Sequence, residues 1–308
     1  MIGLWRGRRR KAADLGGLLD AAIPQALAAR VLVCVTFHYA PKRLAYLYEV
    51  LTTLAGFRVD GLQVVVCTQT TRPAELRLLE RMGTGLFDAD KALRIRSFPD
   101  LDDPYALTWQ HKTILKEFLA AEGERFSHFI YLEDDLRLRY ESFLYFLAAR
   151  KMLAGRGLVP GFVRYEYHPD WDGVFATDHP FPQVLDGRVV ARAGRSLFVA
   201  PNAPYQGLYI LDRSLAQEHV DSAAFDLRQS AAIADWGVRE RAAMGLTFHN
   251  PPPGFGSRFA LPLNAQTLVP ERCCWVHHLS NSYAVNRDPT DPNSVFASLP
   301  IDSVFRST

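Results

Sequence analysis

Residues Phe126–Leu132 read FSHFIYL, and Glu133, Asp134 and Asp135 follow them directly. A short apolar run of this kind is typical of a strand buried in a parallel sheet. Ligands bind at the carboxyl ends of strands in open parallel sheets. Three adjacent carboxylates repel one another, and a divalent cation with oxygen ligands would offset that repulsion. The stretch therefore predicts either a metal site at a sheet edge or a solvated acidic turn.

Strand and helix patterns alternate on the amino-terminal side of this stretch. Strands are predicted at Val31–Phe37, Leu62–Thr68 and Leu93–Phe98, and helices at Arg43–Leu54, Arg72–Met82 and Leu107–Ala121. Short strands separated by helices of this length indicate βαβ units. We therefore expect an α/β fold with a mixed, mainly parallel sheet flanked by helices.

The second half of the chain has a less regular pattern. Helices are predicted at Ser142–Leu153, Ser214–Val220 and Ala231–Met244, strands at Val159–Tyr165, Val189–Ala200 and Leu208–Leu211, a long loop at Asp170–Asp186, and an irregular polar C-terminus after Pro251–Pro253. The sequence shows no internal repeat and no linker after residue 30. We expect a single domain over residues 31–308, preceded by a basic accessory segment over residues 1–30.

Composition and charge exclude several classes of protein. The chain has 48% hydrophobic and 22% charged residues, which excludes a disordered or collagenous protein. Its net charge is +2, and the first eleven residues contain five basic side chains and no acid, so the remainder is slightly acidic. An acidic body argues against nucleic-acid binding. The basic segment could attract anionic lipids or be a solvated tail.

The cysteines and the hydropathy pattern bear on the compartment. The four cysteines include no CxxC pair, which argues against a zinc site or a disulfide framework. No apolar run reaches the ~18–20 residues of a membrane helix. No signal-peptide core follows the basic start. We expect a cytoplasmic protein, with peripheral contact at the inner face of the plasma membrane through the basic segment.

The order of four short motifs resembles the GT-A class of nucleotide-sugar glycosyltransferases, of the type that builds bacterial cell-surface polysaccharides. Members of this class have a DxD-type metal motif after a buried strand, then a glycine-containing acceptor loop, a catalytic acid at a helix start and a metal-binding histidine. The matching segments here are Glu133–Asp135, Tyr205-Gln206-Gly207-Leu208, Ala234-Asp235 and His277-His278. The chain departs from the pattern at Ala234, where many relatives have glutamate.

The resemblance implies a GT-A (Rossmann-like) fold with a nucleotide-binding half (residues 31–136) and an acceptor-binding half (residues 137–308). It implies transfer of a sugar from a nucleotide-diphosphate sugar to a saccharide or lipid-linked saccharide, with Mn²⁺ or Mg²⁺. Asp135 and Glu133 would hold the metal together with His278 or His277, although structural histidines beside Trp275 are the alternative. Asp235 would be the general base of an inverting transfer. If Asp235 is only a helix N-cap, a retaining transfer is the alternative.

The resemblance also distributes the substrate contacts. The expected donor-site residues are Thr36, His38, Tyr39, Thr68, Trp109, His111, Lys112, Glu133 and Asp134, and the expected acceptor-site residues are Tyr205, Gln206, Gly207 and Trp236. The alternatives are ordinary strand-end polar residues and, for Lys112, an exposed position on an amphipathic helix.

Other functions fit the sequence less well. A sugar-1-phosphate nucleotidyltransferase needs a glycine-rich loop after the first strand, and Thr36–Arg43 contains no glycine. A Rossmann dehydrogenase is disfavoured because no GxGxxG motif follows that strand. An inactive sugar-binding module would explain Ala234 but not the acidic triplet. The donor sugar, the acceptor, the linkage and the oligomeric state stay open.

Overall fold

The computed structural model describes residues 27–87, 90–121, 126–170, 172–179, 181–185, 188–233, 236–285 and 299–307. The basic segment before residue 27 and the Ala234-Asp235 pair lie outside the described residues. No described helix has both the length and the apolar character needed to cross a membrane.

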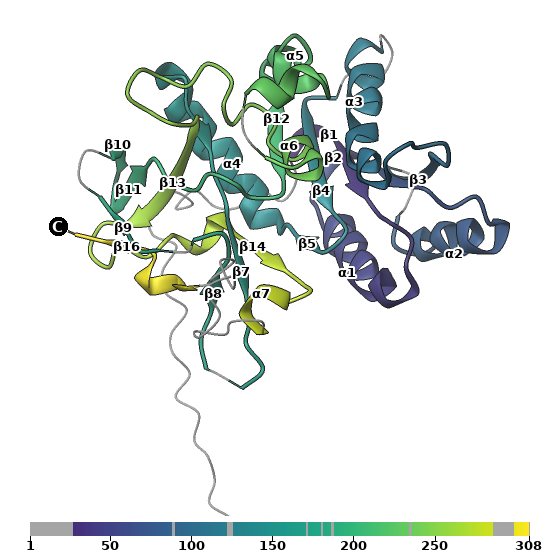
Figure 1. Ribbon diagram of the computed structural model, residues 1–308, viewed down its shortest axis with the longest axis horizontal. Coiled ribbons are helices and arrows are strands. Elements are labelled where there is room, and N and C mark those ends of the chain that lie inside the picture. Colours follow the sequence, from purple (N-terminus) through teal and green to yellow (C-terminus); the bar gives the residue numbers. More distant parts are fainter. Residues whose placement is uncertain are drawn as a thin grey trace, which may run out of the picture.

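A five-stranded sheet forms the amino-terminal half (Figure 1). Its spatial order is β12 (Tyr209–Asp212), β4 (His128–Glu133), β1 (Leu27–Thr36), β2 (Val59–Thr68) and β3 (Lys91–Ser97). Strands β1 to β4 are parallel, and β12 is antiparallel to β4. The prediction of an α/β fold with a mixed, mainly parallel sheet is confirmed.

Helices cover both faces of this sheet. The connecting helices are α1 (Leu44–Ala55), α2 (Pro73–Gly83) and α3 (Gln110–Ala120). Figure 1 shows α1 and α2 on one face and α3 with α5 (Arg213–Val220) on the other. Because both faces are covered, every residue from Val31 to Thr36 is buried. Pro73 occupies the start of α2, where a missing backbone N–H is tolerated.

The strand order places a crevice at one edge of the sheet. The chain adds β2 and then β3 on one side of β1, and then returns to place β4 on the other side. Connections that leave two adjacent parallel strands in opposite directions open a crevice at their carboxyl ends. The last residue of β1, Thr36, is the register partner of Glu133 at the end of β4. The acidic triplet therefore lies at this switch point.

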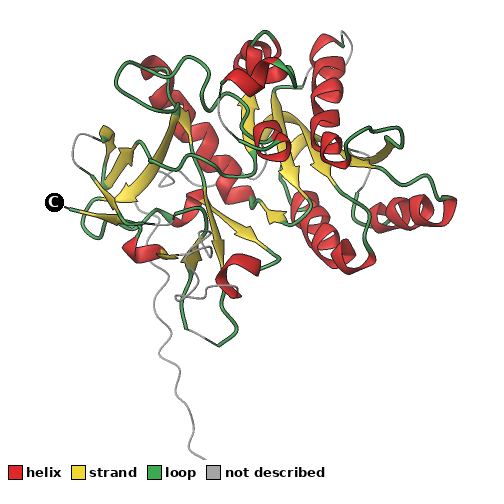
Figure 2. Ribbon diagram, viewed as in Figure 1, coloured by secondary structure: helices red, strands yellow, loops and turns green. Residues whose placement is uncertain are grey.

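The second half contains smaller sheets around the long helix α4 (Tyr140–Leu153), as Figure 2 shows. One sheet has the order β15 (Leu299–Pro300), β8 (Phe175–Ala176), β7 (Val163–Glu166), β14 (Trp275–His278) and β5 (Leu136–Arg137). Another has the order β10 (Val189–Ala193), β11 (Ser196–Val199), β13 (Phe259–Asn264) and β6 (Val159–Pro160), and β16 (Phe305–Arg306) pairs with β9 (Gln183–Val184). A four-residue helix, α7 (Ser282–Val285), follows β14.

Three predictions for the second half are wrong. The strand predicted over Val159–Tyr165 is divided into β6 and β7, which pair with different strands. The helix predicted over Ala231–Met244 is only the short α6 (Val238–Ala242), which begins after Gly237. The C-terminal region and the segment Asp170–Asp186 contain strands of two to six residues. Their pairing with distant segments, rather than a local pattern, determines these strands.

Candidate functional site

A cavity of about 620 Å³ opens at the switch point, and we call it the central cavity. Its charged lining residues are Lys42, Arg43, Arg164, Arg239, Glu133, Asp135, Asp178, Glu240 and His278, which come from both halves of the fold. Its aromatic lining residues are Tyr46, Tyr205, Trp236 and Tyr283. The predicted site residues Glu133, Asp135, His278, Tyr205 and Trp236 thus meet in one cavity.

Arg43 neutralises much of the acidic triplet. Its Nε lies 2.8 Å from Asp134 Oδ2, and its Nη2 lies 2.7 Å from Asp134 Oδ1 and 3.1 Å from Asp135 Oδ2. A guanidinium presents donors in a fixed fork that matches a carboxylate in this way. Asp134 is therefore paired with Arg43 and does not line the central cavity, although we predicted that it contacts the donor. We did not predict Arg43, which ends the short turn Pro41–Arg43 between β1 and α1.

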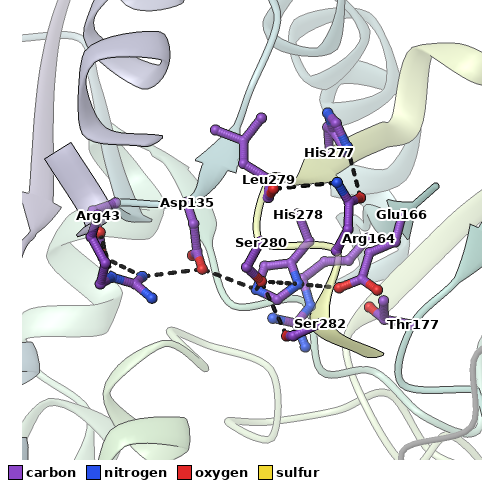
Figure 3. Close-up of polar contacts among 12 residues, drawn as sticks. Arg43, Asp135, Arg164, Glu166, Thr177, His277, His278, Leu279, Ser280 and Ser282 are labelled. Atoms are coloured by element: carbon purple, nitrogen blue, oxygen red, sulfur yellow. Dashed lines mark hydrogen bonds and ion pairs between the residues drawn. The ribbon is translucent and has the colours of Figure 1, made fainter. Parts of the chain in front are cut away.

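His278 lies between two carboxylates that come from different strands (Figure 3). Its Nε2 is 3.2 Å from Asp135 Oδ2, and its Nδ1 is 2.5 Å from Glu166 Oε1. Glu166 is fully buried on β7 and also accepts a hydrogen bond from the backbone N–H of Ala284. Burial lowers the pKa of His278, but the hydrogen bonds to the two carboxylates outweigh it and raise the pKa to about 9. Glu166 is a second contact that sequence reasoning missed.

The two carboxylates of the triplet that line the cavity differ in charge state. Burial and the neighbouring Asp135 raise the pKa of Glu133 to about 7. Burial acts in the same direction on Asp135, but His278 and Arg43 outweigh it and hold its pKa at about 2. Asp135 is therefore a carboxylate at neutral pH, whereas Glu133 is close to its titration midpoint.

The residues at this point are compatible with a divalent cation. Asp135 Oδ1 and Glu133 Oε1 are buried and have no hydrogen-bond partner within the described part of the chain. Carboxylate oxygen and neutral imidazole are suitable ligands for Mn²⁺, and carboxylate oxygen for Mg²⁺. His278, which its pKa of about 9 keeps protonated at neutral pH, would have to release a proton from Nε2 to bind a metal ion. Among the described residues, however, no three His, Cys, Asp or Glu side chains form a group that could hold a metal ion. Mg²⁺ is often bound by one or two carboxylates, with substrate phosphates and water completing its shell.

His277 does not take part in this arrangement. Successive side chains of a strand point to opposite faces, so His277 and His278 diverge on β14. The His277 ring stacks on Tyr165, with centroids 4.9 Å apart and an interplanar angle of 11°, and its Nε2 is 3.2 Å from Asn281 Oδ1. Of the two predicted metal ligands, only His278 faces Asp135.

The predicted acceptor loop contributes one residue to the cavity wall. Tyr205 stacks on Trp236 with ring centroids 5.2 Å apart, and the Arg164 guanidinium lies 5.0 Å from the Tyr205 centroid. Gln206 is buried instead, and its Oε1 accepts a hydrogen bond from the Phe162 backbone N–H at 2.6 Å. Gln206 therefore does not line the central cavity. Gly207 has a φ of 65° and packs against Leu136 and Arg164.

Arg164 was not predicted and forms a second ion pair in the cavity wall. Its Nε and Nη2 donate to the two carboxylate oxygens of Asp178 at 2.8 and 2.6 Å. Both residues line the cavity, and Arg164 is only 3% exposed. A buried guanidinium paired in this way is held rigidly beside the aromatic wall.

The residues predicted after β1 and β2 lie beside another cavity. Tyr39 lines a space of about 420 Å³ together with Pro41 and residues 69–72, and we call it the donor-side cavity. Pro41 lines this cavity and Lys42 lines the central one, so consecutive residues belong to the walls of the two cavities. Thr36 and Thr68 are buried at the strand ends, and His38 Nε2 contacts the Pro104 carbonyl at 2.7 Å. Of the four predicted residues, Tyr39 alone lines the donor-side cavity.

The predicted donor contacts at the start of α3 are in the core instead. Lys112 is 3% exposed, donates to the Ala224 carbonyl at 2.6 Å and lies 3.8 Å from the Trp109 ring centroid. His111 is buried between the Thr108 carbonyl and the Tyr209 hydroxyl, and Trp109 Nε1 donates to the Val238 carbonyl. None of these three residues lines the central or the donor-side cavity, and the exposed alternative for Lys112 is wrong.

Comparisons with known proteins give little support beyond the geometry. No protein-family model and no curated protein matches the chain. Among solved structures, the chain is similar to the crystal structure of TarS from S. aureus, a wall teichoic acid glycosyltransferase. The match has 14% identity and a TM-score of 0.35, and it covers 62% of this chain and 29% of TarS. The likeness is too low to support an argument about activity.

Proposed function

We propose that the protein is a metal-dependent glycosyltransferase that uses a nucleotide-diphosphate sugar. The observation that carries this proposal is the meeting of Asp135 and His278 at 3.2 Å in a cavity at the switch point of a parallel sheet. Ligand-binding crevices of open α/β sheets occur at that point. Within the described part of the chain, Asp135 Oδ1 and Glu133 Oε1 are buried and have no hydrogen-bond partner, so they are the oxygens that a cation would engage.

The donor would extend from the donor-side cavity into the central cavity. Tyr39 offers an aromatic ring for the base, and Lys42, Arg43 and Arg239 offer cations for the diphosphate. A divalent cation would be held by Asp135 and His278, with Glu133 nearby and Glu166 orienting the imidazole. The chemistry that such a cation supplies is Lewis-acid stabilisation of the departing diphosphate.

The acceptor would lie on the wall formed by Tyr205 and Trp236. Its hydroxyl oxygen would form a bond to the anomeric carbon as the bond from that carbon to the diphosphate breaks. We propose Asp235 as the base that takes the hydroxyl proton in an inverting transfer, because the next residue, Trp236, lines the cavity. On this proposal, Asp235→Asn lowers kcat far more than it weakens donor binding.

We also propose a class of acceptor, a compartment and a membrane contact for this protein. The acceptor would be a saccharide or lipid-linked saccharide of bacterial cell-surface polysaccharide synthesis, made on the cytoplasmic side. The basic segment before residue 27 would contact the membrane surface there. Its five basic side chains support such a contact, at about 1 kcal/mol each near an anionic surface. The rest of the chain is slightly acidic, which argues against a nucleic-acid partner.

The test is ligand-linked stabilisation by UDP, GDP or CDP with and without Mn²⁺. We expect one nucleotide to stabilise the protein more strongly when Mn²⁺ is present, by about 2.7 kcal/mol at a concentration 100 times its Kd. Asp135→Asn and His278→Gln should remove the Mn²⁺-dependent part of the shift. His277→Gln is the matched control, because it changes the same residue type one position away on the opposite face of β14.

The outcomes separate the proposal from its alternatives. Loss of the Mn²⁺-dependent shift in His277→Gln but not in His278→Gln would reject the proposed ligands. The absence of stabilisation by every nucleotide would reject the donor class. Binding without any sugar transfer to acceptors would favour an inactive sugar-binding module.

A further inference from the structure

A third cavity, of about 350 Å³, lies beside the acceptor wall, and we call it the distal cavity. Its lining residues include Arg188, Asn202, Pro204, Phe248, Phe255 and Ser257. Pro204 lines the distal cavity and the next residue, Tyr205, lines the central cavity. Consecutive Cα atoms are about 3.8 Å apart, so one short segment separates the two spaces. The Pro204-Tyr205 segment is therefore part of the wall of both cavities.

The distal cavity carries positive charge. Arg188 is the one charged side chain among its described lining residues. Within the described part of the chain, the guanidinium of Arg188 has one acceptor, the Ala200 carbonyl, at a long distance of 3.4 Å. A guanidinium has five N–H donors and matches a carboxylate or phosphate in a bidentate manner. Most of the donors of Arg188 are therefore available to an anionic group.

One lining residue carries a buried hydroxyl without a partner among the described residues. Ser257 is 3% exposed, and its Oγ has no hydrogen-bond partner among the described residues. A buried hydroxyl without a partner is energetically unfavourable, so a ligand oxygen or N–H that reached it would gain binding energy. The partly buried rings of Phe248 and Phe255 add apolar contact area.

We infer that the distal cavity binds an anionic saccharide unit, with Arg188 holding a carboxylate or phosphate group and Ser257 bonding a hydroxyl. A sugar unit provides the two chemistries that the cavity offers, hydrogen-bonding hydroxyls and an apolar ring face, and the anion matches Arg188. Because Pro204 and Tyr205 are consecutive, this unit would be a sugar of the acceptor that lies away from the reacting hydroxyl. Its identification as part of an acceptor rests on the proposed function, whereas the binding site itself does not.

The experiment is a ligand-observed NMR titration of the protein with D-glucuronate, D-glucose and inorganic phosphate. Glucuronate should bind more tightly than glucose, which has the same ring without the carboxylate. Arg188→Gln should weaken glucuronate binding about tenfold or more, as expected for the loss of a charge-assisted hydrogen bond. Arg192→Gln should leave it unchanged, because Arg192 is an exposed arginine on the adjoining strand β10. Circular dichroism checks that each variant folds, and Ser257→Ala decides the matter if Arg188→Gln does not fold.

The inference is overturned if glucuronate does not bind, if glucose binds equally well, or if the decisive variant binds glucuronate as the wild type does. Phosphate binding as tight as that of glucuronate also overturns it, because the site would then recognise only an anion. Stabilisation by nucleotide and Mn²⁺ in the same samples reports on the proposed function separately. Glucuronate binding that depends on Arg188 in a protein that binds no nucleotide supports the site while the proposed function fails.

Discussion

At the scale of single residues, two adjacent histidines show how position determines chemistry. His278 donates toward two carboxylates and has its pKa raised to about 9, whereas burial, the leading cause, lowers the pKa of His277 beside Tyr165. Both are imidazoles on β14, and alternation along the strand sends them to opposite faces. Whether a histidine of β14 meets the acidic triplet therefore depends on which face of the strand its side chain lies on.

A third histidine, His179, should make the stability of the protein depend on pH. It is 3% exposed, and its Nδ1 accepts a hydrogen bond from Gln183 Nε2, which requires a lone pair on that nitrogen. Burial lowers its pKa from 6.5 to about 4. Between these two values the unfolded chain binds the proton and the folded protein does not, so stability falls as pH falls. The loss from this residue is about 3 kcal/mol between pH 6.5 and pH 4.

Urea unfolding at a series of pH values measures this effect. His179→Gln keeps an amide for hydrogen bonding but cannot be protonated, so its free energy of unfolding should fall less than that of the wild type between pH 6.5 and pH 4. Other buried histidines also titrate, so the difference between the two proteins is the relevant quantity. Parallel losses in the two proteins would show that the pKa of His179 is the same in the folded and unfolded states, contrary to this prediction.

At the scale of elements, the amino-terminal half follows from local pattern. Its strands β1, β2 and β4 are largely buried and appear as apolar runs, and Pro73 indicates the start of α2. The second half does not follow from local pattern, because β6 and β8 have two residues each. β6 pairs with the distant β13, and β8 lies between β7 and the distant β15. Such strands are too short to give a periodic signal, and only tertiary pairing defines them.

The candidate site shows the same division. Glu133 and Asp135 could be predicted because they follow a recognisable strand. Arg43 and Arg164 could not be predicted, because arginine is common on protein surfaces and the partners of these two lie on other elements. Lys112 was misplaced because a lysine in a helix is usually exposed, and only the packing of α3 against α5 and the following turn buries it.

Gly207, which precedes β12, should be sensitive to substitution. Its φ of 65° is in the left-handed region, and a Cβ there would lie 3.0 Å from Leu136 Cδ1 and 3.2 Å from Arg164 Nη1. Gly207→Ala should lower the free energy of unfolding by about 1–2 kcal/mol, from the backbone conformation alone. Gly155→Ala is the control, since a Cβ there meets nothing within 4 Å. Equal stabilities of the two variants in urea would contradict this explanation.

At the scale of the whole molecule, α4 connects the two halves. On one side, Phe143 stacks on Phe57 at 5.7 Å and meets the ring of His128 on β4 at 5.3 Å. On the other side, the Tyr145 hydroxyl donates to the Gly161 carbonyl at 3.1 Å, and its ring meets Phe162. A helix with apolar contacts all round is a core helix rather than a surface one. The continuous apolar core that results predicts a single cooperative unit over both halves.

Phe143→Ala tests that prediction directly. Phe143 is fully buried, and removing its ring should lower the free energy of unfolding by about 3–5 kcal/mol. Tyr48→Ala on α1 is the control, because Tyr48 is 49% exposed and its loss should change stability little. Hydrogen exchange measured by mass spectrometry resolves the two halves. If they unfold as one unit, the slowest amides of β1 and β4 and those of β11 and β13 should lose protection by the same free energy. If only β1 and β4 lose protection, the two halves unfold separately. The acidic triplet and His278 would then be brought together only by the docking of two independently stable parts.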